Sequence, residues 1–124
     1  MTAMRFRQAI VTAIHDEMER DATVILFGED VAAAEGPFKT SEGLLEKFGS
    51  ERVKDTPISE MGFTGAAVGA AMLGLRPVIE IMFMEFLGVA LDQLVTEGIT
   101  ALNATAKQNT IDQQNNKKIK GVKK

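Results

Sequence analysis

Val-Lys-Asp-Thr-Pro-Ile-Ser-Glu-Met-Gly-Phe, residues 53–63, joins a short strand to an apolar helix. Pro57 must end the strand that begins at Val53, because proline has no amide hydrogen to give to a sheet. Ser59 is a candidate cap for the helix that follows, and Gly74 is a candidate stop. The stretch therefore predicts a strand that passes directly into a helix.

The sequence upstream of this stretch predicts another strand between two helices. An amphipathic helix is expected first, because apolar residues recur at every fourth position. Its apolar face comprises Phe6, Ile10, Ile14 and Met18. A strand over 24–27 ends at Gly28, and Ser41 is a candidate cap for a short helix that Gly49 can end in the left-handed conformation.

Downstream, a buried strand is expected over 77–82 and a helix over 86–97. The apolar face of that helix would comprise Leu87, Leu91, Leu94 and Val95. Strand and helix thus alternate three times along the chain. This alternation favours an α/β fold, with a parallel sheet flanked by helices.

The composition narrows the class of protein. Apolar residues make up 45% of the 124 residues and charged residues 25%, which is typical of a soluble globular domain. There is no Cys and a single His, so we expect no disulfide and no metal site, and a cytoplasmic location. The most apolar run, 61–75, is shorter than the roughly 20 residues of a membrane span. We therefore expect no membrane contact.

Charge is distributed unevenly along the chain. Residues 1–106 hold eight basic and sixteen acidic side chains, which argues against nucleic acid as a partner. Residues 98–124 are instead rich in Lys, Asn and Gln and poor in large apolar residues. We predict a domain over 1–97 and a largely mobile tail over 98–124, with at most a short helix over 99–108.

Glu60 is the strongest candidate for chemistry. It stands where a strand end passes into an apolar helix, and open α/β sheets bind ligands at the carboxyl ends of their strands. If Glu60 is buried, its neutral form is favoured, and such a carboxyl group can exchange a proton with a ring nitrogen. The alternative is an ordinary first-turn acid that is stabilised by the helix dipole.

Other candidate features also have two interpretations. The glycines of the helix from Ser59 allow either tight packing within one domain or a subunit interface. Phe86 is either a core residue or a ring that stacks on a flat ligand. Glu29, Asp30 and Asp92 are acids of a type that is most often solvated or capping.

Several motifs together resemble the beta subunit of pyruvate dehydrogenase-type 2-oxo acid dehydrogenases, which include the branched-chain and acetoin enzymes. They are Phe-Gly-Glu-Asp-Val (27–31), Gly-Leu-Leu-Glu-Lys-Phe-Gly (43–49), Asp-Thr-Pro-Ile-Ser-Glu-Met-Gly-Phe (55–63), Gly-Ala-Ala-Val-Gly-Ala-Ala-Met (65–72), Gly-Leu-Arg-Pro-Val (74–78) and Leu-Asp-Gln-Leu-Val (91–95). The resemblance covers about residues 4–97.

The resemblance implies a transketolase-like domain that holds the aminopyrimidine of thiamine diphosphate. Glu60 matches the family glutamate that hydrogen-bonds the pyrimidine ring nitrogen and activates the cofactor for oxidative decarboxylation, with acyl transfer to lipoamide. Met82 and Phe86 match apolar groups packed on the pyrimidine, and we place Ile58 with them. Glu29, also expected at the cofactor, and Asp92 match acids of a proton channel between paired active sites.

The resemblance also implies partners. These are an alpha subunit, which holds the diphosphate and its magnesium ion, a second beta subunit in an alpha2beta2-like tetramer, and the lipoyl acyltransferase core of the complex. Family members continue past the position of Glu97, so we interpret the chain as a truncated beta subunit that is inactive alone. The alternative is a non-catalytic interaction fragment, or a relic of the fold, that binds no cofactor by itself.

Overall fold

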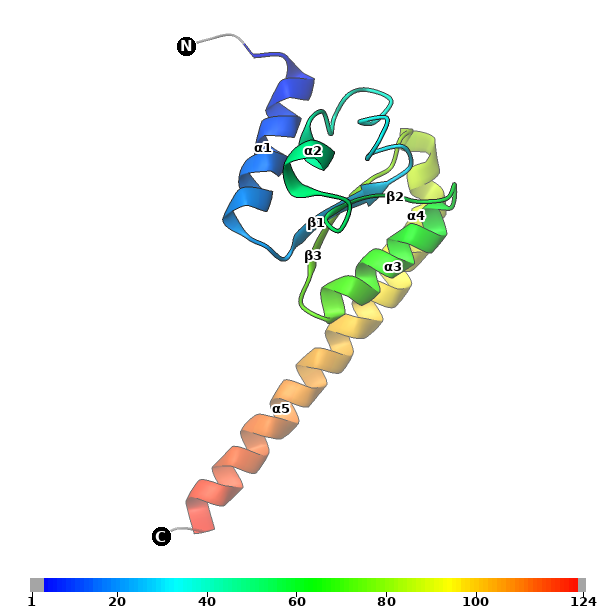
Figure 1. Ribbon diagram of the computed structural model, residues 1–124. Coiled ribbons are helices and arrows are strands. Elements are labelled where there is room, and N and C mark those ends of the chain that lie inside the picture. Colours follow the sequence, from blue (N-terminus) through cyan, green and yellow to red (C-terminus); the bar gives the residue numbers. More distant parts are fainter. Residues whose placement is uncertain (1–3, 123–124) are drawn as a thin grey trace.

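The structure, a computed structural model, describes residues 4–122, with side chains except at 105 and 113–122. It contains a three-stranded parallel sheet in the order β2-β1-β3, flanked by helices (Figure 1). The elements are α1 (Phe6–Arg20), β1 (Val24–Gly28), α2 (Leu44–Phe48), β2 (Val53–Asp55), α3 (Glu60–Met72), β3 (Arg76–Glu80), η1 (Met84–Phe86), α4 (Leu87–Asp92), η2 (Gln93–Glu97) and α5 (Gly98–Val122). The predicted α/β class is confirmed.

Strand β1 lies at the centre of the sheet, and its last residue fixes the level of the other two strands. Gly28 is in register with Asp55 of β2 and with Glu80 of β3, so all three strands end at the same edge. A side chain at Gly28 would place its Cβ only 2.8 Å from the backbone oxygen of Glu80. Only glycine therefore permits this close approach of β1 to β3.

Helices cover both faces of the sheet, because β1 is apolar on both sides. On one face Leu26 packs beneath α1 and α2, in a core that also contains Met18 and Leu44. On the other face Phe27 packs against Phe63 and Ala67 of α3. Figure 1 shows α1 and α2 on one side of the sheet and α3 with α4 on the other.

The predicted helix boundaries are confirmed at three of their capping residues. The Ser59 hydroxyl accepts the backbone N–H of Gly62, at 3.3 Å, and α3 begins at Glu60. Gly74 follows the end of α3 with φ +94°, and Gly49 follows α2 with φ +78°. The predicted cap at Ser41 is wrong. Its hydroxyl instead donates to the carbonyl of Val31, so it fastens the preceding loop.

Two predicted apolar faces are only partly buried. Phe6 is 83% exposed because it lies at the very start of α1, and Val11 takes a place in the core instead. On the helix expected over 86–97, Leu91, Leu94 and Val95 are exposed. That segment is also built from three pieces, η1, α4 and the π-helical turn η2, rather than one regular helix.

The short helix expected over 99–108 is part of a much longer helix. The backbone stays helical through Gly98 (φ −63°, ψ −44°) and continues as α5 to Val122, away from the sheet (Figure 1). The segment over 99–120 has neither Gly nor Pro, the two residues that most disfavour the interior of a helix. No helix in the described range is long and apolar enough to cross a bilayer.

Candidate functional site

A cleft of about 510 Å³ opens at the edge where the three strands end. Segments that follow β1, β2 and β3 each contribute to it, as expected for the carboxyl edge of a parallel sheet. The cleft is lined by Glu29, Asp30, Thr56, Ile58, Glu60, Met82, Phe83 and Phe86. All five residues that the sequence predicted at the cofactor, which are Glu29, Ile58, Glu60, Met82 and Phe86, therefore lie around one cavity.

Glu60 is half-buried and is the first residue of α3. It occupies the place of a first-turn acid, where the helix dipole favours a negative charge, and it also lines the cleft. Its position as a first-turn acid is therefore confirmed, and its role in proton exchange stays a prediction. The Ser59 cap fixes the start of α3 and so holds the Glu60 backbone at the cleft.

Glu29 is the most perturbed acid of the cleft. Burial raises the pKa of Glu29 above its usual value, and repulsion from Glu60 and Asp30 raises it further, while the Ser59 backbone amide opposes the change. Its Oε1 atom is buried and has no hydrogen-bond partner within the described part of the chain. A buried polar atom without a partner is unfavourable, so this oxygen can accept a donor from a ligand or share a proton.

The remaining walls offer flat or apolar surface beside one further polar atom. Phe83, Phe86 and Met82 present two rings and a thioether, and Ile58, 86% exposed, stands at the rim. The buried Thr56 hydroxyl has no hydrogen-bond partner among residues 4–122. An aminopyrimidine has a ring nitrogen and an amino group that can hydrogen-bond carboxyl groups, and a flat ring that can stack on aromatic side chains. The cleft offers both kinds of partner.

Comparisons with known proteins agree with this geometry. Residues 2–110 match the family model described as transketolase, pyrimidine binding domain. The chain belongs to this pyrimidine-binding domain family. It is 48% identical over 106 residues to the pyruvate dehydrogenase E1 component subunit beta-2 of Oryza sativa subsp. japonica, covering 86% of this chain and 26% of that one.

Two further relatives of the pyrimidine-binding domain are similar over most of its length. The pyruvate dehydrogenase E1 subunit beta of Bos taurus is 53% identical over 89 residues, which cover 72% of this chain and 25% of that one. The 2-oxoisovalerate dehydrogenase subunit beta of Bacillus subtilis is 45% identical over 97 residues, which cover 78% and 30%. The matched parts thus amount to 25% to 30% of these relatives.

The family match and the helical conformation of the backbone both continue past Glu97. The match to the pyrimidine-binding domain extends to residue 110, which lies inside α5. The domain boundary expected at Glu97 stays a prediction. The mobility of the segment over 98–124 stays a prediction.

Asp92 is the one predicted site residue that does not line the cleft of this pyrimidine-binding domain. It is exposed on α4, and its carboxylate accepts the hydroxyl of Thr96 at 3.0 Å. Conversely, Asp30, Thr56 and Phe83 line the cleft without having been predicted there. The position of Thr56 directly after β2 could have indicated it, because residues that follow parallel strands gather at one edge.

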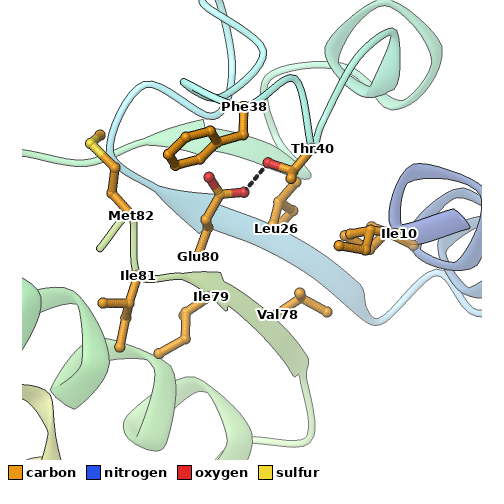
Figure 2. A pocket seen from close by; sticks show the side chains of 10 residues that line it. Ile10, Leu26, Phe38, Thr40, Val78, Ile79, Glu80, Ile81 and Met82 are labelled. Carbon is orange, nitrogen blue, oxygen red and sulfur yellow. Dashed lines mark hydrogen bonds between the residues drawn. The ribbon is translucent and has the colours of Figure 1, made fainter. Parts of the chain in front are cut away.

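A second cavity, of about 360 Å³, shares Met82 with the cleft. It lies along β3 beneath α1, as Figure 2 shows, and its lining is mostly apolar. Its polar groups are the Glu80 carboxylate and the Thr40 hydroxyl, and Thr40 donates a hydrogen bond to Glu80. The two groups satisfy each other, so this cavity offers a ligand less polar recognition than the cleft does.

One glycine of helix α3 lies close to another part of the chain. A Cβ at Gly65 would lie 2.8 Å from the amide oxygen of Gln93, which belongs to the π-helical turn η2. That oxygen is the end of a flexible side chain that can move aside, so this contact alone does not require glycine at this position. At Gly69 a Cβ would meet no atom of the described chain within 4 Å, so an interface with another subunit stays an open explanation there.

Proposed function

We propose that this chain supplies the pyrimidine-side wall of a thiamine diphosphate site in the E1 component of a 2-oxo acid dehydrogenase. The observation that carries the proposal is the meeting of Glu29 and Glu60 in one cleft with aromatic walls. Relatives named as beta subunits of the pyruvate dehydrogenase E1 component and of 2-oxoisovalerate dehydrogenase support the same assignment. Glu60 is the catalytic acid in this proposal.

Each residue of the cleft has its own role in this proposal. Glu60 hydrogen-bonds the pyrimidine ring nitrogen and holds or shares a proton there. Met82 and Phe86 pack against the faces of the ring, and Ile58 shields its rim from water. When bound, thiamine diphosphate supplies the nucleophilic thiazolium carbon that a 2-oxo acid requires for decarboxylation.

Glu29 lowers the charge of the site in this proposal. Burial and the nearby charge of Glu60 raise the pKa of Glu29, so the Glu29 carboxyl keeps its proton to a higher pH than an ordinary glutamate does. A retained proton leaves this carboxyl group able to donate as well as accept. Such a group suits a ring nitrogen that must be protonated and deprotonated in turn. Asp92, exposed on α4, would contribute to proton transfer only from outside this cleft.

Partners complete the site in this proposal. An alpha subunit holds the diphosphate and its magnesium ion. A second beta subunit gives an alpha2beta2-like tetramer, and a lipoyl acyltransferase core takes up the acyl group. We place this assembly in the cytoplasm. Exposed apolar side chains support the proposal that other chains cover this surface, because such groups commonly mark interaction sites. In the lining of the cleft these are Ile58, Phe83 and Phe86.

The experiment tests binding in an assembly. The chain is mixed with the alpha subunit of a pyruvate dehydrogenase E1, thiamine diphosphate and magnesium are added, and cofactor affinity is measured by calorimetry. We expect binding that Glu60→Gln weakens about tenfold or more, while Glu46→Gln, an exposed acid on α2, leaves it unchanged. Absence of binding, or binding indifferent to Glu60, would leave the non-catalytic interaction fragment as the better description.

A further inference from the structure

Three phenylalanine rings form a connected series that ends in the cleft. Phe38 contacts Phe83 edge to face, with ring centroids 6.2 Å apart and an interplanar angle of 85°. Phe83 in turn contacts Phe86 at 6.2 Å and 71°. Phe83 and Phe86 line the cleft, whereas Phe38 lines only the neighbouring cavity (Figure 2). Edge-to-face contact is a favoured geometry for aromatic pairs, so each ring restrains the next.

The loop that carries Phe38 is fastened on both sides of it. The buried Ser41 hydroxyl donates to the carbonyl of Val31 at 2.6 Å, which closes the base of the loop. The Thr40 hydroxyl donates to the carboxylate of Glu80 and so ties the loop to the end of β3. Phe38 is therefore held at a defined place although its side chain is 57% exposed.

Phe86 needs such support. It is exposed at the end of η1, and its backbone N–H donates to the carbonyl of Phe83 at 3.0 Å. The Phe86 ring contacts the Phe83 ring, and the Phe83 ring in turn contacts the Phe38 ring. Phe38 is therefore linked to the cleft wall through a single intermediate ring.

We propose that Phe38 is a positioning residue for the cofactor cleft, one that holds the Phe86 ring against the pyrimidine by way of Phe83. The inference rests on the proposed function for the identity of the ligand, but the coupling of the three rings does not depend on it. Phe38 touches neither cofactor nor substrate in this proposal.

Fluorine NMR tests the coupling without any ligand. The full chain is labelled with para-fluorophenylalanine, and the signals of Phe83 and Phe86 are assigned from Phe83→Leu and Phe86→Leu. We expect Phe38→Leu to move both signals and Phe38→Tyr, which keeps the ring, to leave the Phe86 signal in place. The matched control is Phe6→Leu, which removes an 83% exposed ring from α1. A Phe86 signal that does not respond to Phe38→Leu, or that responds equally to Phe6→Leu, overturns the inference.

Cofactor affinity tests the consequence in the assembly with an alpha subunit. We expect Phe38→Leu to weaken thiamine diphosphate binding by about 2- to 10-fold, the range of one aromatic pair, and Phe38→Tyr to restore it. Unchanged affinity in Phe38→Leu, beside a binding wild-type chain, overturns the positioning role. If the wild-type chain binds no cofactor, the proposed function fails, and the fluorine spectrum still decides whether the rings are coupled.

Discussion

Glu29 and Glu60 line the same cleft, and the charge of Glu60 contributes to raising the pKa of Glu29. The two acids come from different connections, one after β1 and one at the start of α3, and the parallel sheet brings them together. Burial is the larger cause of the raised pKa and Glu60 the next. The site thus places two interacting acids where a ligand would enter.

This raised pKa predicts a pH-dependent effect of Glu29→Gln on stability. The folded state binds the Glu29 proton more tightly than the unfolded state does, so ionisation destabilises the fold increasingly as pH rises through the folded pKa. We expect Glu29→Gln to raise Tm by a few degrees at neutral pH. The gain should vanish near pH ~3, more than one unit below the usual glutamate pKa of about 4.3, where Glu29 is almost fully protonated in both states.

Thermal unfolding of the variant and the wild-type chain at both pH values checks this. The exposed Glu46→Gln serves as the matched control and should show no such pH-dependent gain. A Glu29→Gln chain that is less stable than wild type at neutral pH would show that the ionised carboxylate is stabilised in the fold.

Asp55 should stabilise the loop after β1. Its Oδ1 accepts the backbone N–H of Ala32 at 2.6 Å, and its Oδ2 accepts that of Ala33 at 3.4 Å. We expect Asp55→Ala to lower the free energy of unfolding by about 1–2 kcal/mol, measured in urea. Asp55→Asn keeps one accepting oxygen and should lose less. A free energy of unfolding that does not change in Asp55→Ala would mean that the hydrogen bonds contribute nothing.

Thr64 offers a stabilising substitution. It is fully buried in α3, and its hydroxyl has no partner within the described residues. We expect Thr64→Val, which keeps the shape and removes the hydroxyl, to raise the free energy of unfolding by about 1 kcal/mol. Thr64→Ser retains the hydroxyl and loses a methyl group, so it should destabilise. Destabilisation by Thr64→Val would reveal a partner for the hydroxyl.

Self-association of the isolated chain is also expected. The sheet order leaves one side of β3 without a strand partner in the described chain, and unpaired edges promote association. The exposed Leu91, Leu94 and Val95 add apolar surface. Sedimentation over a range of concentrations should show species larger than the monomer. A monomer with one sharp unfolding transition would contradict this prediction.

Much of the fold was determined by local features of the sequence. Pro57, Ser59 and Gly74 act through their own backbone or the next few residues, so the strand-to-helix connection and the ends of α3 could be predicted from them. The alternation of strands and helices along the chain predicted the parallel sheet. The resemblance of the motifs identified the five residues that meet around the cleft.

Only the tertiary structure decided which long-range contacts these elements make. The raised pKa of Glu29, the series from Phe38 to Phe86 and the place of Asp92 outside the cleft depend on how separate segments are brought together. Periodicity marked helix faces as apolar, but burial requires something to pack on them, as Phe6 shows. Local sequence specifies the conformation of a segment, whereas burial and charge coupling belong to pairs of segments, and the sheet decides which pairs meet.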